Sequence, residues 1–403
     1  MARRTHIRIP VHRVGRGLPP LGDEFVSVET LGGIALLAAT VAALVWANIA
    51  GGDSYSDLWH TEFTLGLGDL SITEDLRHWV NDGLMTFFFF VVGLEIKREL
   101  IEGDLRDPKT AALPALAALG GMVLPAALFL SLNPSAPGSD GWGIPVATDI
   151  AFAVGVLSLL GSRIPKGLKL FLLTLAIVDD IGAILVIAVF YSSGLSGPWL
   201  GGAVATLLVF FVFQRLGIRH PVAYVAPGVV LWVCTLESGV HATLAGVVLG
   251  LLAPNQDWRG QPVIGRLEHL LHPWTSFVVV PLFALANAGV ALGGDVLGDA
   301  LTSRVTLGVM AGLVLGKTVG VSAAVAAAVR LRLGRLPPGV HPRQVVGAAA
   351  LAGIGFTVSL FIADLSFAGT ALLDDAKVGI LLASVTSGLL GVLVLLPRAS
   401  ARR

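Results

Sequence analysis

Two adjacent aspartates, Asp179 and Asp180, lie in the apolar run LAIVDDIGAILVI of residues 175–187. Burying one carboxylate among apolar side chains is costly, and two neighbouring carboxylates also repel each other. Carboxylate oxygens bind protons and hard cations, which would remove both penalties. The pair therefore predicts a site that a proton or a cation occupies.

Three more polar residues lie in similarly apolar segments. Lys317 and Asp149 are ionisable, and Thr148 precedes Asp149 in the sequence ATDIAFAVG. A structural ion pair that locks two helices is the simpler interpretation, and it would suffice for one acid and one lysine. Three acids and one base do not balance pairwise, so a cationic species is expected to visit the site.

The composition indicates whether these residues lie in a soluble protein or in a membrane protein. The 403-residue chain is 55% hydrophobic and only 13% charged, with a mean hydropathy of +0.82, whereas soluble proteins carry about a quarter charged residues. The first apolar run, residues 31–50, is too long for a signal peptide. A single cysteine excludes an intrachain disulfide framework, and a net charge of zero gives no indication of a nucleic-acid partner.

Apolar runs long enough to cross the bilayer recur along the chain. They predict an all-α polytopic membrane protein with twelve transmembrane helices, at residues 30–50, 78–97, 110–132, 144–161, 168–192, 199–214, 221–236, 239–253, 274–293, 305–329, 345–368 and 376–397. The predicted organisation is a basic, disordered tail (1–28), a membrane domain (29–397) and a second basic tail (398–403).

Positive charge tests this count, because lysine and arginine collect in cytoplasmic loops. Both tails are arginine-rich, and most other basic residues fall in loops after even-numbered spans. The loops after odd-numbered spans, together with the adjoining span ends, hold only Arg77, Arg304 and Lys377, and Lys317 lies deep within a span. Both termini are therefore predicted to be cytoplasmic, which requires an even number of spans.

Two predicted spans contain helix-breaking residues in matching positions of two halves. Residues 144–161 include Pro145 and Gly155, and residues 345–368 include Gly353, Gly355 and Thr357. Each is the middle span of a group of three, spans 3–5 and 10–12. This pattern predicts inverted-topology repeats with two interrupted helices around a binding site near the bilayer midplane.

Several longer segments of the chain form a recognisable series. The segments VNDGLMTFFFFVVGLEIKREL, ATDIAFAVGVLSLLG, LAIVDDIGAI, SGVHATLAGV, RLEHLLHPW, PLFALANAGV and LAGIGFT occur in order between about Glu29 and Pro397. Together they resemble the NhaA-type sodium/proton antiporters. That family is itself a type example of inverted-repeat transporters, so the repeat pattern and the resemblance are not independent.

The resemblance implies a non-enzymatic, multi-pass protein of the bacterial inner membrane that serves pH homeostasis. Its expected activity is the electrogenic exchange of cytoplasmic Na⁺ or Li⁺ for external protons, activated at alkaline pH, with no cofactor. By position, Asp180 resembles the principal cation ligand and Asp179 its acidic neighbour. Thr148 and Asp149 resemble the residues at the break of span 4, and Lys317 resembles the lysine that pairs with the site.

Other candidate residues depend more strongly on the resemblance. Asp82 matches an acid at the external end of span 2, and Thr357 lies at the break of span 11. A cluster tied to pH activation in the family is matched by Glu95, Glu99, Glu268 and His269, with His241 as a further histidine. An ordinary charged helix end is the alternative for the glutamates. A metal site including His272 is rejected because no further ligands accompany it.

This chain departs from the family pattern at two positions of interest. Thr318 follows Lys317 where familiar members have proline, so the bend of span 10 need not be the same. Asp364 is an additional acid at the external end of span 11, and the resemblance assigns it no role.

Two other functions match parts of the sequence. The motif GLGD at residues 66–69 matches intramembrane aspartyl proteases, but it falls in a polar loop without a facing aspartate. A Na⁺-coupled transporter of an organic anion with a related fold remains the alternative, although such a site would need more polar side chains and no lysine beside two acids. In the same loop, residues that alternate between apolar and polar around the glycine-rich turn predict an external β-hairpin near Trp59–Ile72 that supports a homodimer.

Overall fold

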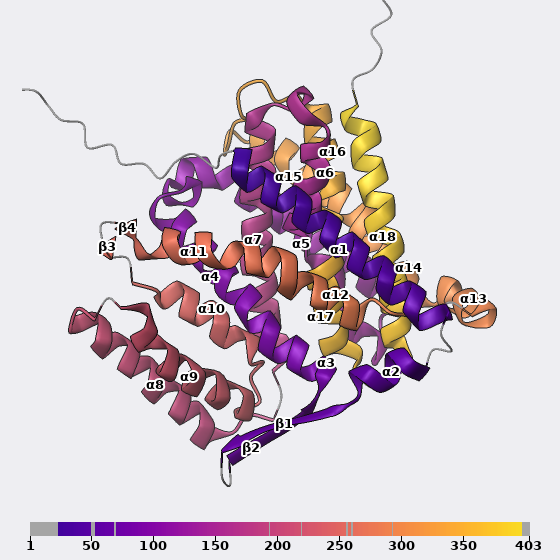
Figure 1. Cartoon of the computed structure of the whole chain (residues 1–403). Coiled ribbons are helices and arrows are strands. Elements are labelled where there is room, and N and C mark those ends of the chain that lie inside the picture. The colour runs from indigo at the N-terminus through magenta and orange to yellow at the C-terminus, as the bar shows by residue number, and fades with distance from the viewer. Residues whose placement is uncertain are drawn as a thin grey trace, which may run out of the picture.

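The structure is a computed structural model that describes residues 23–49, 53–67, 70–192, 194–218, 220–254, 257–258, 261–291 and 293–396. Residues 1–22 of the predicted N-terminal tail (1–28) and the whole predicted C-terminal tail (398–403) lie outside the described residues. The first helix begins at Asp23, within the segment that the sequence predicts as a disordered tail. Figure 1 shows that this helix begins, and the last helix ends, at the end of the molecule opposite the hairpin.

Helices make up nearly all of the described chain. The first half contains α1 (Asp23–Ile49), α2 (Asp53–Trp59), α3 (Leu76–His78), η1 (Trp79–Leu84), α4 (Met85–Ile101), η2 (Asp104–Arg106), α5 (Pro108–Leu132), η3 (Gly138–Val146), α6 (Ile150–Leu159), η4 (Gly161–Arg163), α7 (Lys166–Phe190) and α8 (Gly197–Arg215). The second half contains η5 (Pro221–Tyr224), α9 (Val225–Glu237), α10 (Thr243–Leu252), α11 (Val263–Trp274), η6 (Thr275–Val279), α12 (Val280–Asn287), α13 (Gly294–Thr302), α14 (Arg304–Met310), η7 (Ala311–Gly316), α15 (Lys317–Arg330), α16 (Pro342–Leu351), α17 (Phe356–Phe367) and α18 (Leu372–Leu395).

Within the described residues, seven helices are long and apolar enough to cross a membrane, or nine if two bent pairs each count as one span. The seven are 30–49, 108–132, 166–190, 197–215, 263–287, 304–330 and 372–395. The three remaining predicted spans coincide with α4, α9 and α10, which are shorter or more charged. Twelve spans and the inverted repeats therefore remain predictions.

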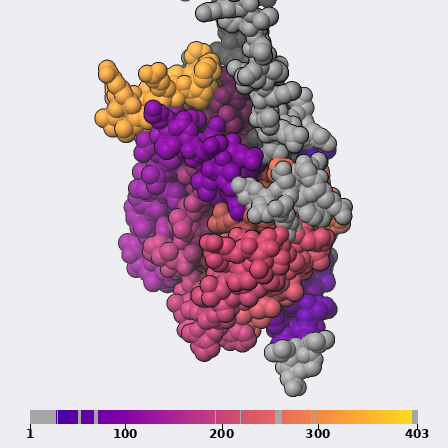
Figure 2. Space-filling view, turned by 90° about the vertical axis from the view of Figure 1, so that its left-hand side faces the viewer, coloured from indigo at the N-terminus to yellow at the C-terminus, as the bar shows by residue number. Residues whose placement is uncertain are grey.

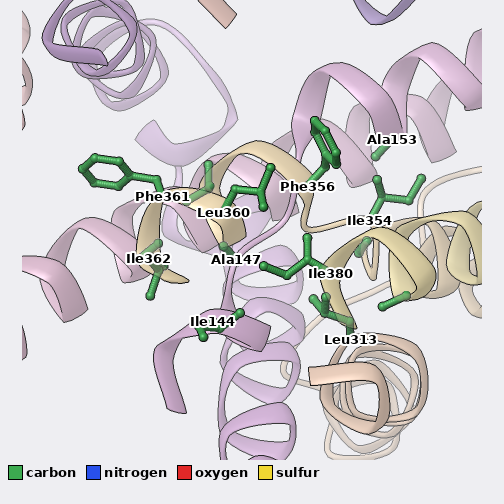
Figure 3. Packing of buried hydrophobic residues seen from close by; sticks show 14 of the residues in the cluster. Ile144, Ala147, Ala153, Leu313, Ile354, Phe356, Leu360, Phe361, Ile362 and Ile380 are labelled. Atoms are coloured by element: carbon green, nitrogen blue, oxygen red, sulfur yellow. The ribbon is translucent and has the colours of Figure 1, made fainter. Parts of the chain in front are cut away.

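The two bent pairs are the interrupted helices. The axes of η3 and α6 differ by 43° across residues 147–149, and those of α16 and α17 differ by 46° across residues 352–355. Figure 3 shows the apolar packing around these breaks, to which the first pair contributes Ile144 and Ala147 and the second pair contributes Ile354, Phe356 and Leu360. The interruption predicted from proline and glycine is thus present in both segments.

The predicted hairpin is also present. Strands β1 (Glu62–Leu67) and β2 (Leu70–Asp75) pair antiparallel, with Glu62 opposite Asp75 and Leu65 opposite Ile72. Its position is shifted a few residues toward the C-terminus of the predicted range. The hairpin is attached to the helices by Trp79, whose indole nitrogen donates to the carbonyl oxygen of Phe63 at 2.8 Å. Two further short strands, β3 (Asp257–Trp258) and β4 (Gln261–Pro262), pair separately.

The helices divide into a large group and a smaller layer. Residues 197–252, which include α8, α9 and α10, form the lower front of the surface in Figure 2. They carry their own small apolar cluster around Phe210, Leu231 and Ala245. The larger core includes both bent pairs together with α5, α7, α14 and α18. The polar residues predicted to form the site all lie in or beside this larger group.

Glycine allows two long helices of this core to meet closely. A Cβ atom at Gly320 of α15 would lie 2.2 Å from the carbonyl oxygen of Gly120 on α5, so no larger residue fits there. One turn earlier on α15 is Lys317, whose aliphatic chain passes Gly121. The close helix contact therefore brings the lysine into the protein interior.

Candidate functional site

The central feature of the site is a buried ion pair between α7 and α15. Nζ of Lys317 lies 2.5 Å from Oδ2 of Asp179, and both side chains are 0% exposed. The hydroxyl of Thr148 also donates to this oxygen, at 2.7 Å, and lies 2.8 Å from the carbonyl oxygen of Ala352. Asp179 thus connects α15 to the breaks of both interrupted helices.

Asp180 is the next residue of α7 but faces a different environment. Consecutive helical side chains differ in direction by about 100°, and Asp180 lines a cavity of about 70 Å³ together with Asp149, Thr148 and Thr357. Its side chain is only 5% exposed, and its buried Oδ1 has no hydrogen-bond partner among the described residues. A buried carboxylate oxygen without a donor is unfavourable, so this position favours a proton or a cation.

Asp149 joins the two interrupted helices. It is the N-cap of α6, where its Oδ1 accepts from the backbone amide of Phe152 at 3.0 Å. Its Oδ2 accepts from the amide and the hydroxyl of Thr357 at the start of α17, at 3.0 and 2.7 Å. One carboxylate therefore satisfies donors at two helix N-termini, where the helix dipoles also favour negative charge.

The segment before Lys317 differs from a regular α-helix. Residues 311–316 form the π-helical turn η7, between α14 and α15. Pro125 of α5 packs against this turn at Gly316, where a Cβ atom would lie 2.7 Å from the proline Cα. The hydroxyl of Thr318 donates to the carbonyl of Val314 at 2.6 Å. This chain therefore has an irregular turn at the lysine with threonine, rather than proline, after it.

The cavity continues from Asp180 along α4, away from the hairpin. Its wall includes Glu95 and Arg98 of α4 and His272 of α11. Arg98 forms an ion pair with Glu268, which is buried, and a weaker one with Glu99 at 3.4 Å. The glutamates predicted to form a pH-sensitive cluster are thus gathered around one arginine at the cavity.

Both predicted histidines lie away from this cluster. His269 is exposed on α11, although it follows Glu268 directly in the sequence. His241 lies before α10, where its Nε2 is 2.7 Å from the carbonyl oxygen of Tyr191. Asp82 belongs to the π-helical turn η1 beside the hairpin, outside the cavity lining.

Two cavity residues were not assigned by sequence reasoning. The sequence did not indicate a role for Arg98, and His272 was considered only as a metal ligand. A helix repeat of 3.6 residues places His272, four residues after Glu268, on the same face, whereas His269 points elsewhere. The four-residue spacing of Glu268 and His272 in RLEHLLHPW therefore predicts that His272 faces the same side as Glu268.

Comparison with known proteins agrees with these features. The family model Na⁺/H⁺ antiporter 1 matches residues 23–395. Similar proteins include the Na⁺/H⁺ antiporter NhaA of Acidovorax sp. strain JS42, 51% identical over 93% of both chains, and that of Escherichia coli O1:K1, 48% identical over 91% of this chain and 96% of the other. The Na⁺/H⁺ antiporter NhaA 2 of Sorangium cellulosum is 46% identical over 96% of this chain and 92% of the other.

A solved structure has a similar fold. The sodium proton antiporter MjNhaP1 from Methanocaldococcus jannaschii matches with a TM-score of 0.55 and 13% identity, over 92% of this chain and 98% of the other. At that identity the likeness concerns the fold alone. The family model and the relatives cover almost the whole described chain, so this chain is a member of the Na⁺/H⁺ antiporter 1 family.

Proposed function

We propose that the protein exports cytoplasmic Na⁺ or Li⁺ in exchange for external protons, at the pair Asp179 and Asp180. The observation that carries the proposal is Asp180, a buried carboxylate with an oxygen unpartnered among the described residues, which lines a cavity beside an ion-paired neighbour. Carboxylate and hydroxyl oxygens suit a hard alkali cation. A site of few ligands also releases its ion readily, as a transporter requires.

Competition for the same oxygens explains the exchange. A proton on Asp180 neutralises it and prevents it from coordinating Na⁺, and bound Na⁺ excludes the proton. Because Asp179 lies next in the helix, the two carboxylates titrate as a coupled pair. If the cation displaces more than one proton, each cycle moves net charge and the exchange is electrogenic.

Access and regulation form further parts of the proposal. The cavity runs along α4 toward the end of the molecule that the distribution of lysine and arginine predicts to be cytoplasmic. Cytoplasmic Na⁺ would pass Glu95, Arg98 and Glu268 on its way to Asp180. Titration of this cluster would adjust entry and give activation at alkaline pH.

The hairpin supports the proposal of a homodimer. Phe63 and Leu65 of β1 are 48% and 52% exposed, and a two-stranded sheet has two outer edges that a further strand can pair with, although Trp79 already occupies the carbonyl of Phe63 on β1. A second copy of this chain, which has the same edge, would extend the sheet.

The test is uptake of ²²Na⁺ into proteoliposomes after a pH jump that makes the lumen acidic. Uptake should depend on the pH gradient and should be lost in Asp180→Asn, which keeps the side-chain shape. Asp374→Asn provides the matched control, since Asp374 is an exposed acid at the start of α18. Uptake by the wild type that is independent of the pH gradient, or undiminished uptake by Asp180→Asn, would contradict the proposal.

A further inference from the structure

A second polar cluster lies at the hairpin end of the same helices. The amides of Asn81 on η1 and Asn287 on α12 exchange hydrogen bonds of 3.3 and 2.8 Å. The Nδ2 of Asn81 also donates to Oδ2 of Asp364 on α17 at 2.8 Å. Asn81 and Asn287 are 4% and 1% exposed. These three residues, called here the amide–carboxylate triad, connect three helices that are far apart in sequence.

An aromatic layer lies about one or two helical turns further inside, on α17, on α12 and on α4, which continues η1. Phe361 is packed against Phe89, with ring centroids 5.4 Å apart, and against Phe283 at 6.4 Å. All three rings are at most 3% exposed. Neither these rings nor the triad residues are among the residues that line the cavity at Asp180. The two layers therefore separate the cavity from the hairpin end.

The order along α17 connects these layers to the ion site. Thr357, which is bonded to Asp149, comes first, Phe361 follows about 6 Å further along the helix and Asp364 about 10 Å further. The break at residues 352–355 lies just before Thr357. A movement of α17 about this break that opens a path to the hairpin end must separate Asp364 from Asn81.

The surroundings of Asp364 are charged on several sides. Asp82 of η1, His241 before α10 and Lys377 of α18 are each close enough to interact with it electrostatically. Lys377 is 3% exposed. Asp364 thus accepts a direct hydrogen bond from Asn81, while His241 and Lys377 attract it at longer range and Asp82 repels it.

We propose that Asp364 is a positioning residue for exchange, and that its hydrogen bond to Asn81 keeps the path to the hairpin end closed in the inward-facing state. This hydrogen bond is called the latch, and the triad and the aromatic layer that close the path are called the external gate. The inference rests on the proposed function, because it assigns the gate to an exchanger whose cavity faces the cytoplasm. Loss of the latch lowers the fraction of inward-facing protein. A smaller competent fraction raises the apparent KM for cytoplasmic Na⁺ in proportion.

The first experiment measures KM for Na⁺ at the cytoplasmic side in Asp364→Ala, Asp364→Asn and the control Asp374→Asn. Asp364→Ala removes the acceptor and should raise KM about fivefold with kcat kept within twofold. Asp364→Asn retains a carbonyl acceptor for Asn81 and should stay within twofold of the wild type, as should the control. The latch is contradicted if Asp364→Ala matches the wild type, or if Asp364→Asn is as impaired as Asp364→Ala.

The second experiment locks the contact. In a Cys234→Ser background, Asn81→Cys and Asp364→Cys are combined and oxidised, and cross-linking is read from the mass of the peptides. We expect the cross-linked protein to lose at least nine-tenths of the exchange that the reduced form of the same protein shows. Exchange that is unchanged after cross-linking would overturn the latch.

The two experiments also separate the latch from the proposed function. If the unmodified protein exchanges Na⁺ but the variants behave like the wild type, the latch alone is wrong. If the unmodified protein does not exchange Na⁺, the proposed function is wrong, and the latch falls with it whatever the cross-link yield.

Discussion

Asp179 and Lys317 form an ion pair that is completely buried, 138 residues apart in sequence and 2.5 Å apart in space. A buried pair contributes little net stability when it is intact, but removing one partner leaves an uncompensated charge in a medium of low polarity. Substitution of either residue should therefore affect both the stability of the fold and the exchange activity. Measuring stability and exchange separately distinguishes the two effects.

Lys317→Ala should destabilise the fold by about 3–5 kcal/mol, because Asp179 loses its partner. Lys317→Arg keeps the charge and should retain partial exchange with a smaller loss of stability. The measurement is thermal unfolding in detergent, read by fluorescence. The double substitution Asp179→Asn with Lys317→Ala serves as the control and should recover part of the loss. A Lys317→Ala protein with the melting temperature of the wild type would show that the pair is not structural.

Asp149→Ala should weaken the contact between the two interrupted helices. The loss of an N-cap costs about 0.5–2 kcal/mol, and the donors of Thr357 would lose their acceptor as well. Thr357→Val is the matched control, since it removes only the hydroxyl and should cost about 1 kcal/mol. Both values are to be obtained from denaturant unfolding. Equal losses for the two variants would mean that Asp149 does not cap both helices.

Glu268→Gln should raise the apparent KM for Na⁺ about fivefold, equivalent to about 1 kcal/mol. The substitution removes the closer of the two ion-pair partners of Arg98, which leaves more uncompensated positive charge beside the cavity and opposes the entry of a cation. His269→Ala is the comparison, because that side chain is exposed and should leave KM unchanged. Initial exchange rates at several Na⁺ concentrations give both values. A larger effect of His269→Ala would mean that the exposed histidine carries the regulation.

Replacing residues 62–74 by two glycines should weaken the dimer and leave exchange intact. Glu62 pairs with Asp75, so the ends of the deletion are adjacent, and Asp75 is retained to cap α3. Without β1 and β2 there is no edge for a second copy to pair with. Cross-linking and native gels would measure the dimer. An unchanged oligomeric state would mean that the dimer contact does not involve the hairpin.

Sequence patterns predicted which two helices are interrupted, and they singled out the ionisable residues that the structure brings together at the breaks. The adjacent aspartates and the lysine could be recognised because ionisable groups in apolar segments are costly. Glycine and proline likewise indicated both interrupted helices and the hairpin. These features depend on local chemistry, which a sequence shows directly.

Long-range side-chain contacts were less accessible. The sequence placed His269 beside Glu268, but helix periodicity brings His272 to the cavity instead. The hydrogen bond between Asn81 and Asp364 joins residues 283 positions apart. No spacing rule pairs residues on separate helices. The sequence alone therefore does not show which residue contacts Asp364, because that contact depends on how α17 packs against η1 and α12.

The dependence of the Na⁺ KM on pH tests the shared site most directly. Initial exchange rates are measured against Na⁺ concentration at several pH values in everted vesicles. If Na⁺ and H⁺ compete at Asp179 and Asp180, KM should rise as the pH falls, by up to about tenfold per pH unit for each proton that must leave, and saturating Na⁺ should largely restore the rate. A KM that stays constant across the activation range would contradict the shared site and move the action of protons to a separate place, such as the cluster of Glu95, Glu99 and Glu268.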